Sequence, residues 1–156
     1  MDVTKEEDVK RAINQTVEKF GTIHVALPFA GVVSLAPTLT SRGSINMKVF
    51  EKVIQINTMG SVYVAKYAAV QMSKNEAVSG EKGVIVFVSS ILAHEGQGAQ
   101  TAYSASKGAI SGLILPMARD LGRYNIRVVG IAAGLFDTPM VKMDIVPPNK
   151  KEYLLK

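Results

Sequence analysis

The stretch from Ser90 to Lys107 reads Ser-Ile-Leu-Ala-His-Glu-Gly-Gln-Gly-Ala-Gln-Thr-Ala-Tyr-Ser-Ala-Ser-Lys. Ser90 follows directly on an unbroken apolar run, residues 83–89, which is typical of a buried strand. Tyr103 begins a helical pattern in which Lys107 lies four positions on, one turn further along the same face. The stretch therefore predicts a serine hydroxyl at a strand end, close to a tyrosine phenol and a lysine ammonium.

These three side chains have a chemical use together. A free phenol, with a pKa near ~10, is a poor acid or base at neutral pH, but a cation one turn away stabilises the phenolate. Tyr103 can then exchange a proton with a substrate alcohol or ketone. Ser90, donating to the same oxygen, would orient the substrate and support the developing charge. The alternative interpretation is a strand-to-helix loop with an incidental tyrosine, because a lone Tyr-x-x-x-Lys motif is weak.

The spacing makes the motif more specific, because Ser90 stands thirteen positions before Tyr103 with a Gly-rich connection between them. This spacing and the run Tyr-Ser-Ala-Ser-Lys-Gly at 103–108 resemble the short-chain dehydrogenase/reductase family. The resemblance implies that the catalytic serine, tyrosine and lysine of the family fall on Ser90, Tyr103 and Lys107. It also implies that Asn57 holds a water linking the lysine to bulk solvent. A helix asparagine bonded locally is the alternative for Asn57.

The whole chain, 1–156, reads as one incomplete short-chain dehydrogenase/reductase domain of alternating helices and strands. Apolar spacing predicts helices at about 5–20, 46–75 and 102–122, and strands at about 23–27, 83–89 and 126–132. A capping box at Thr4–Glu7 should begin the first helix, Gly21 should end it, and Pro116 should kink the last. The order predicts an α/β fold, a partial doubly wound parallel sheet of Rossmann-like type with helices on both faces.

Two segments that follow strands resemble cofactor-binding positions of the family. Residues 28–31 resemble its Asn-Asn-Ala-Gly motif, although Pro28 replaces an asparagine. Residues 133–139 resemble its Pro-Gly-x-x-x-Thr-Pro segment, with Ala133 in place of the proline. The resemblance implies that NAD, or NADP, is bound by Asp2, Val3, Phe29, Ala30, Gly31, Tyr103, Lys107, Gly134, Phe136 and Thr138. Within this set, the Asp2–Val3 pair would meet the adenine.

A Gly-x-x-x-Gly-x-Gly phosphate-binding turn does not occur in the sequence. We therefore expect the strand at 23–27 to form an exposed edge, and the chain alone to bind dinucleotide weakly and to be marginally soluble. Two functions remain open at this point. One is an oxidoreductase; the other is a non-catalytic scaffold subunit of a larger assembly that has lost dinucleotide binding.

A narrower resemblance, to type II 3-hydroxyacyl-CoA dehydrogenases, rests on runs such as Lys-Phe-Gly at 19–21, His-Glu-Gly-Gln at 94–97 and Leu-Pro-Met-Ala-Arg-Asp-Leu at 115–121. It implies a 3-hydroxyacyl-CoA or hydroxysteroid substrate, NAD, a mitochondrial location and a homotetramer. The helices at 46–75 and 102–122 would make the contacts between subunits.

Composition narrows the remaining possibilities. The absence of cysteine excludes disulfides and thiol chemistry, and no apolar run approaches the ~20 residues of a membrane span. The N-terminus has neither a signal core nor a transit pattern. The net charge of +5 raises the question of a nucleic-acid partner, but no aromatic residues are interleaved with the basic residues, as a nucleic-acid interface would require. Residues 140–156, which hold a cluster of lysines, read as a substrate lid or a frayed tail.

Overall fold

The computed structural model describes residues 1–136 and 138. Helices and strands follow one another as α1 Glu6–Phe20, β1 Val25–Ala26, β2 Leu39–Thr40, β3 Gly43–Ser44, α2 Met47–Ile54, η1 Gln55–Met59, α3 Gly60–Met72, β4 Gly83–Ser90, α4 Leu92–Glu95, α5 Thr101–Gly122 and β5 Ile126–Ala133. The predicted lid or tail at 140–156, with its lysines, lies outside the described residues.

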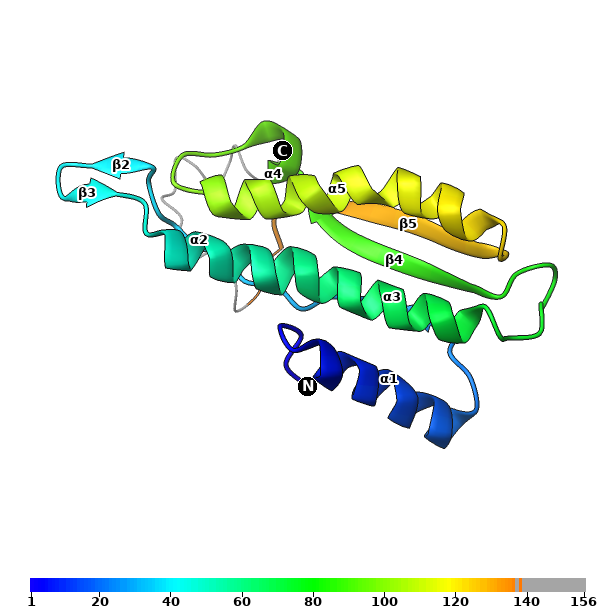
Figure 1. Cartoon of the computed structure of the whole chain (residues 1–156). Helices are drawn as coiled ribbons and strands as arrows, with labels where there is room; N and C mark the ends of the chain where they lie inside the picture. Colours follow the sequence, from blue (N-terminus) through cyan, green and yellow to red (C-terminus); the bar gives the residue numbers. More distant parts are fainter. Residues whose placement is uncertain (137, 139–156) are drawn as a thin grey trace.

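Three of the strands, β1, β4 and β5, form one parallel sheet in the order β1-β4-β5. Its two long strands, β4 and β5, lie side by side in Figure 1. β4 pairs with β5 along its whole length, from Gly83 opposite Ile126 to Ser90 opposite Ala133. β1 pairs with β4 over two residues only. The α/β class and the parallel strands are confirmed, and the carboxyl ends of all three strands meet at one edge of the sheet.

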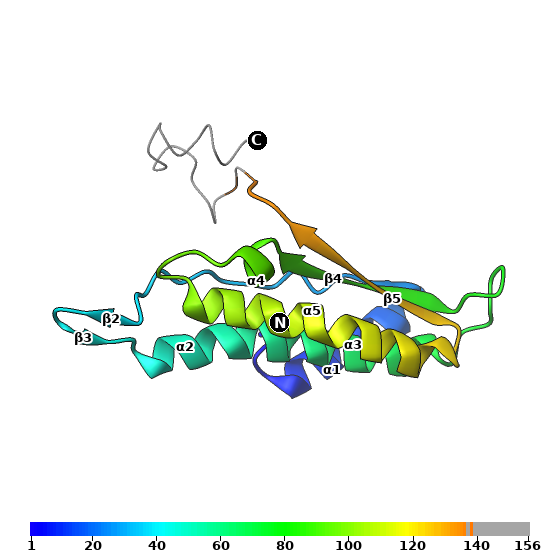
Figure 2. The same cartoon turned by 90° about the horizontal axis from the view of Figure 1, so that it is seen from above.

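The long helices lie against one face of this sheet (Figure 2). Ile85 and Phe87 of β4 point into this helical layer and are 0% exposed. On the opposite face, Val25 and Ile131 are 55% and 54% exposed. The prediction of helices on both faces is therefore wrong for the described residues. The sheet order runs in one direction from β1 to β5, and right-handed crossovers that advance in one direction place every helix on the same side.

The helix predicted at 46–75 contains a π-helical turn, η1, between α2 and α3. Asn57 lies in this turn and is 1% exposed. Ser61 donates its hydroxyl to the Asn57 carbonyl at 2.7 Å. π-Turns of this kind occur frequently at functional sites, because they rotate a side chain out of the regular helical register.

The start of α1 differs from the prediction. The N-cap residue is Lys5 and makes no side-chain cap, while the Thr4 hydroxyl donates to the Asp2 carboxylate at 2.8 Å. A short local bond from Thr4 to Asp2 thus replaces the predicted capping box, since such side chains compete for nearby groups. Gly21 ends the helix with a φ of +83°, as predicted.

One further detail was not predicted: the region expected to be a loop at 32–45 contains the antiparallel β2–β3 hairpin. Pro116 lies inside α5, which continues as a helix to Gly122, as predicted, and the kink expected at Pro116 stays a prediction. Among residues 1–136 and 138, no helix is long and apolar enough to cross a membrane.

Candidate active site

Tyr103 and Lys107 lie one turn apart near the start of α5, as predicted. The Lys107 ammonium stands 5.8 Å from the centre of the Tyr103 ring, within the range of a cation–π contact. Its Nζ donates to the Val88 carbonyl of β4 at 2.7 Å. Lys107 is 9% exposed, and this burial lowers the pKa of its ammonium. Lys107 is therefore fixed between the strand and the phenol ring.

Ser90 is the last residue of β4 and is 5% exposed. Its hydroxyl accepts a hydrogen bond from the Leu92 amide at 3.2 Å, which leaves the hydroxyl proton free to donate. Ser90 follows Val88, the residue that binds Lys107, by two positions on the same strand. The structure thus gathers Ser90, Tyr103 and Lys107 around the carboxyl end of β4.

Asn57 approaches this group from the π-turn and makes three long-range hydrogen bonds. Its Oδ1 accepts from the Val32 amide at 2.8 Å, and its Nδ2 donates to the Val32 carbonyl and to Ser106 Oγ, both at 2.9 Å. The interpretation of Asn57 as a locally bonded helix residue is therefore wrong for its side chain. Asn57 joins the segment after β1 to helix α5.

Ser106 completes this connection and is a residue that the sequence reasoning missed. It is 0% exposed, accepts from Asn57 and donates to the Tyr103 carbonyl at 2.7 Å. Ser106 lies three residues after Tyr103, so the helical spacing was the only signal that placed it near the phenol. The buried Ser106 hydroxyl therefore links the π-turn that contains Asn57 to the first turn of α5, which contains Tyr103.

The predicted cofactor positions fall mainly in the segments that follow β1 and β5. Gly31 packs near Asn57, because a Cβ added to Gly31 would lie 3.5 Å from Asn57 Oδ1. The exposed positions are Phe29, Ala30, Gly134, Phe136 and Thr138. Both segments leave the edge of the sheet where Ser90 lies, since the strands are parallel. Ligands of open α/β sheets bind in this position.

The remaining predicted pair, Asp2 and Val3, lies at the start of α3. A Cβ added to Gly60 would come within 2.8 Å of Val3, so the glycine permits this approach. Hydrogen bonds from the amide and then the hydroxyl of Thr4 lower the pKa of Asp2 below its ordinary value. The pair is therefore held next to the turn that contains Asn57, with Asp2 charged and exposed.

The residues present fit the nicotinamide end of a dinucleotide. An ammonium carries three donors, and Lys107 uses one of them on Val88 within the described residues. Two donors remain for vicinal hydroxyls such as those of a ribose. Small or exposed positions border the same edge of the sheet, so a flat ring can approach the backbone there.

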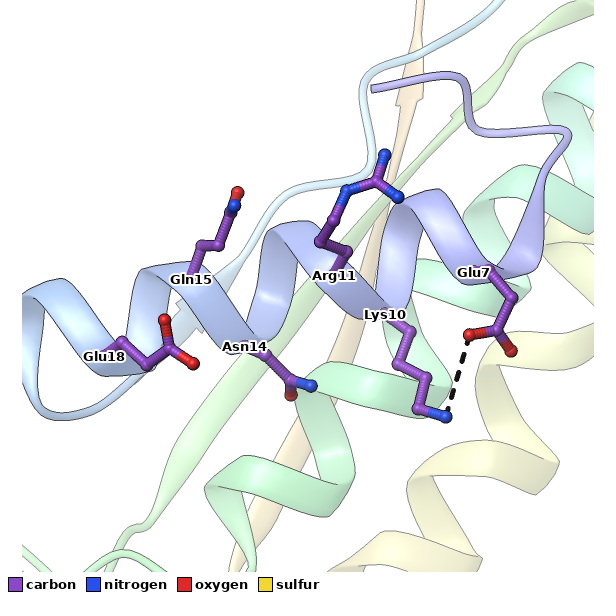
Figure 3. Close-up of a pocket in the computed structure, with 6 residues that line it drawn as sticks. All are labelled: Glu7, Lys10, Arg11, Asn14, Gln15 and Glu18. Carbon is purple, nitrogen blue, oxygen red and sulfur yellow. Dashed lines mark ion pairs between the residues drawn. The ribbon is translucent and has the colours of Figure 1, made fainter.

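A hollow of about 430 Å³ borders Val32, the residue whose backbone binds Asn57, and is lined by Val32, Val33, Ser34, Lys48, Val49, Lys52 and Val53. A shallow groove of about 390 Å³ follows the outer face of α1 (Figure 3) and is lined by Glu7, Lys10, Arg11, Asn14, Gln15 and Glu18. A Lys10–Glu7 ion pair of 3.7 Å crosses it. These are the solvated charges of an amphipathic helix and include no predicted site residue. The described residues contain no group of three or more acidic or histidine side chains placed to hold a metal ion.

The parallel sheet and the helices packed against it define an α/β protein of Rossmann-like type, with Ser90 at the carboxyl end of β4. The family model for short chain dehydrogenase matches residues 1–146. The chain belongs to the short-chain dehydrogenase family.

Within this family, the chain is similar to several named relatives and solved structures. The chain is 43% identical over 156 residues to the 3-hydroxyacyl-CoA dehydrogenase type-2 of Bos taurus, covering 98% of this chain and 59% of the relative. The crystal structure of the enzyme of the same name from Mycobacterium avium matches with a TM-score of 0.84 at 33% identity, covering 93% and 58%. NAD+-bound xylitol dehydrogenase matches with a TM-score of 0.76 at 34% identity, covering 85% and 48%. The chain thus spans about three fifths of the bovine relative's length.

Proposed function

We propose that this chain carries the proton-transfer site of an NAD(P)-dependent oxidoreductase that interconverts a secondary alcohol and a ketone. The observation that carries the proposal is the buried Lys107 ammonium between the Val88 carbonyl and the Tyr103 ring, beside Ser90. A buried cation is costly to maintain and is expected where it supports a charge that develops in a reaction. Membership of the short-chain dehydrogenase family supports the same conclusion.

Each residue has a role in this proposal. Ser90 donates to the substrate oxygen and holds it in line. Tyr103 takes the hydroxyl proton during oxidation and returns it during reduction, while Lys107 stabilises the phenolate that forms. Asn57 maintains the proton path to solvent. Bound NAD(P) supplies the hydride acceptor, and Lys107 would hold its ribose hydroxyls.

The finer assignments rest on the relatives. We propose NAD as the cofactor, with NADP as the alternative, and a 3-hydroxyacyl-CoA or a hydroxysteroid as the substrate, because relatives at 43% and 39% identity bear the name 3-hydroxyacyl-CoA dehydrogenase type-2. A mitochondrial location and a homotetramer belong to the same proposal. Val70 and Leu115, 49% and 56% exposed, lie on the two helices proposed to form the subunit contacts.

The experiment is a dehydrogenation assay on the protein that carries this chain. Absorbance at 340 nm follows reduction of NAD or NADP with a short 3-hydroxyacyl-CoA and with a hydroxysteroid. Tyr103→Phe should abolish turnover, because the proton acceptor is removed, whereas Tyr124→Phe, at an exposed tyrosine, should leave turnover unchanged. Equal rates for Tyr103→Phe and the unmodified protein would refute the role of Tyr103. Lack of turnover in a protein that is a stoichiometric subunit of a larger assembly would select the scaffold.

A further inference from the structure

A second serine of β4 faces the helical layer and has no assigned role. Ser89 precedes Ser90 and is 3% exposed. Its hydroxyl donates to the Lys107 carbonyl at 2.9 Å and lies 2.7 Å from the Ser111 hydroxyl. A serine hydroxyl has one proton, so the proton between the two serines must come from Ser111. Ser89 therefore joins strand β4 to the helical turn that begins at Lys107.

Lys107 is consequently attached to β4 at both of its ends. Its Nζ binds the carbonyl of Val88, and its own carbonyl accepts from Ser89, the next residue of the strand. The two attachments close a ring that runs along the lysine side chain and returns through one peptide unit. The distance between the helical turn at Lys107 and strand β4 therefore sets the position of the ammonium. It also sets the 5.8 Å separation between the ammonium and the centre of the Tyr103 ring.

We propose that Ser89 is a positioning residue for Lys107: the Ser89 hydroxyl holds the Lys107 turn against β4 and thereby keeps the ammonium on the Val88 carbonyl beside Tyr103. The role of Ser89 in a reaction rests on the proposed function of Lys107. The geometric role does not, because it concerns contacts within this chain alone. Ser89 touches no reacting atom in this scheme and acts through Lys107.

Acetylation of individual lysines, followed by mass spectrometry of the folded protein, measures how often each ammonium leaves its partner. Lys82 is an internal reference, since its Nζ also donates to a backbone carbonyl, that of Ser73, at 2.9 Å and is partly buried. Ser89→Ala should raise the acetylation rate of Lys107 roughly fivefold, the factor expected from one lost hydrogen bond, and leave Lys82 unchanged. Ser111→Ala is the matched control, because it removes the partly buried hydroxyl that binds Ser89 and keeps the Ser89–Lys107 bond.

The outcomes separate the possibilities. The positioning role is supported if the acetylation rate of Lys107 alone rises in Ser89→Ala and equals that of the unmodified protein in Ser111→Ala. An unchanged Lys107 rate, a parallel rise at Lys82, or an equal rise in Ser111→Ala would each overturn it. A protein in which Ser89 shields Lys107 but which oxidises no alcohol would refute the proposed function and leave the positioning role standing.

Discussion

Replacing Ser106 by alanine tests the connection between the π-turn that contains Asn57 and the turn of α5 that contains Tyr103. Ser106 is 0% exposed and its hydroxyl makes two bonds, accepting from Asn57 Nδ2 at 2.9 Å and donating to the Tyr103 carbonyl at 2.7 Å. In Ser106→Ala the Tyr103 carbonyl keeps its helical partner, but one N–H of Asn57 is left buried without an acceptor. The variant therefore loses both hydrogen bonds and retains one unsatisfied donor.

The expected cost follows from that donor. A buried polar group without a partner costs about 1 to 3 kcal/mol of unfolding free energy. With a urea m value of about 2 kcal/mol per molar, the midpoint of unfolding should fall by roughly 1 M at an unchanged m value. Urea titration followed by far-ultraviolet circular dichroism measures both quantities.

Ser104→Ala is the matched control on the same helix. The Ser104 hydroxyl is buried and has no hydrogen-bond partner among the described residues. The substitution places alanine, a strong helix former, inside the helix and removes an unsatisfied hydroxyl. The free energy of unfolding should therefore stay the same or rise. A midpoint for Ser106→Ala equal to that of the unmodified protein, or an equal loss in Ser104→Ala, would refute the reasoning about Ser106.

Two further predictions concern the contacts of α3. Gly60→Ala should cost about 1 to 3 kcal/mol in urea unfolding, since its Cβ would lie 2.8 Å from Val3; an unaltered midpoint would contradict this close approach. Hydrogen bonds from Lys66 and then Tyr67 lower the pKa of Glu6 below its ordinary value of 4.5. Because the folded-state pKa is depressed, the Glu6 contribution is present above pH 4.5 and is lost as the pH falls through the folded value. Stability curves of the unmodified protein and Glu6→Gln should therefore converge in acid, and a constant separation across pH 3 to 7 would show that the carboxylate contributes nothing.

The strand and helix around the site were predictable because their patterns are local. An unbroken apolar run indicates a buried strand, and the four-residue spacing from Tyr103 to Lys107 indicates one helical face; β4 and α5 confirm both. The attachment of Lys107 to Val88 was not predictable, since it depends on how the helix sits over the strand. Ser89 and Ser106 were missed for the same reason.

Other differences have separate physical causes. The π-turn at Asn57 was not visible in the periodicity, because it spans only residues 55–59 of a long amphipathic pattern, and five residues are too few to define a period of their own. The cap expected from Thr4 was lost to a competing carboxylate at Asp2. The one-sided helical layer follows from the sheet order β1-β4-β5, and a sequence pattern of alternating strands and helices does not give that order.

The most direct test of the central claim is the crystal structure of the protein that carries this chain, bound to a nicotinamide dinucleotide and a ketone substrate. The substrate oxygen should lie within about 3.2 Å of both the Ser90 hydroxyl and the Tyr103 phenol, with the Lys107 ammonium directed at the ribose hydroxyls. A ketone oxygen that contacts neither Ser90 nor Tyr103 would contradict the assignment of this group as the proton-transfer site.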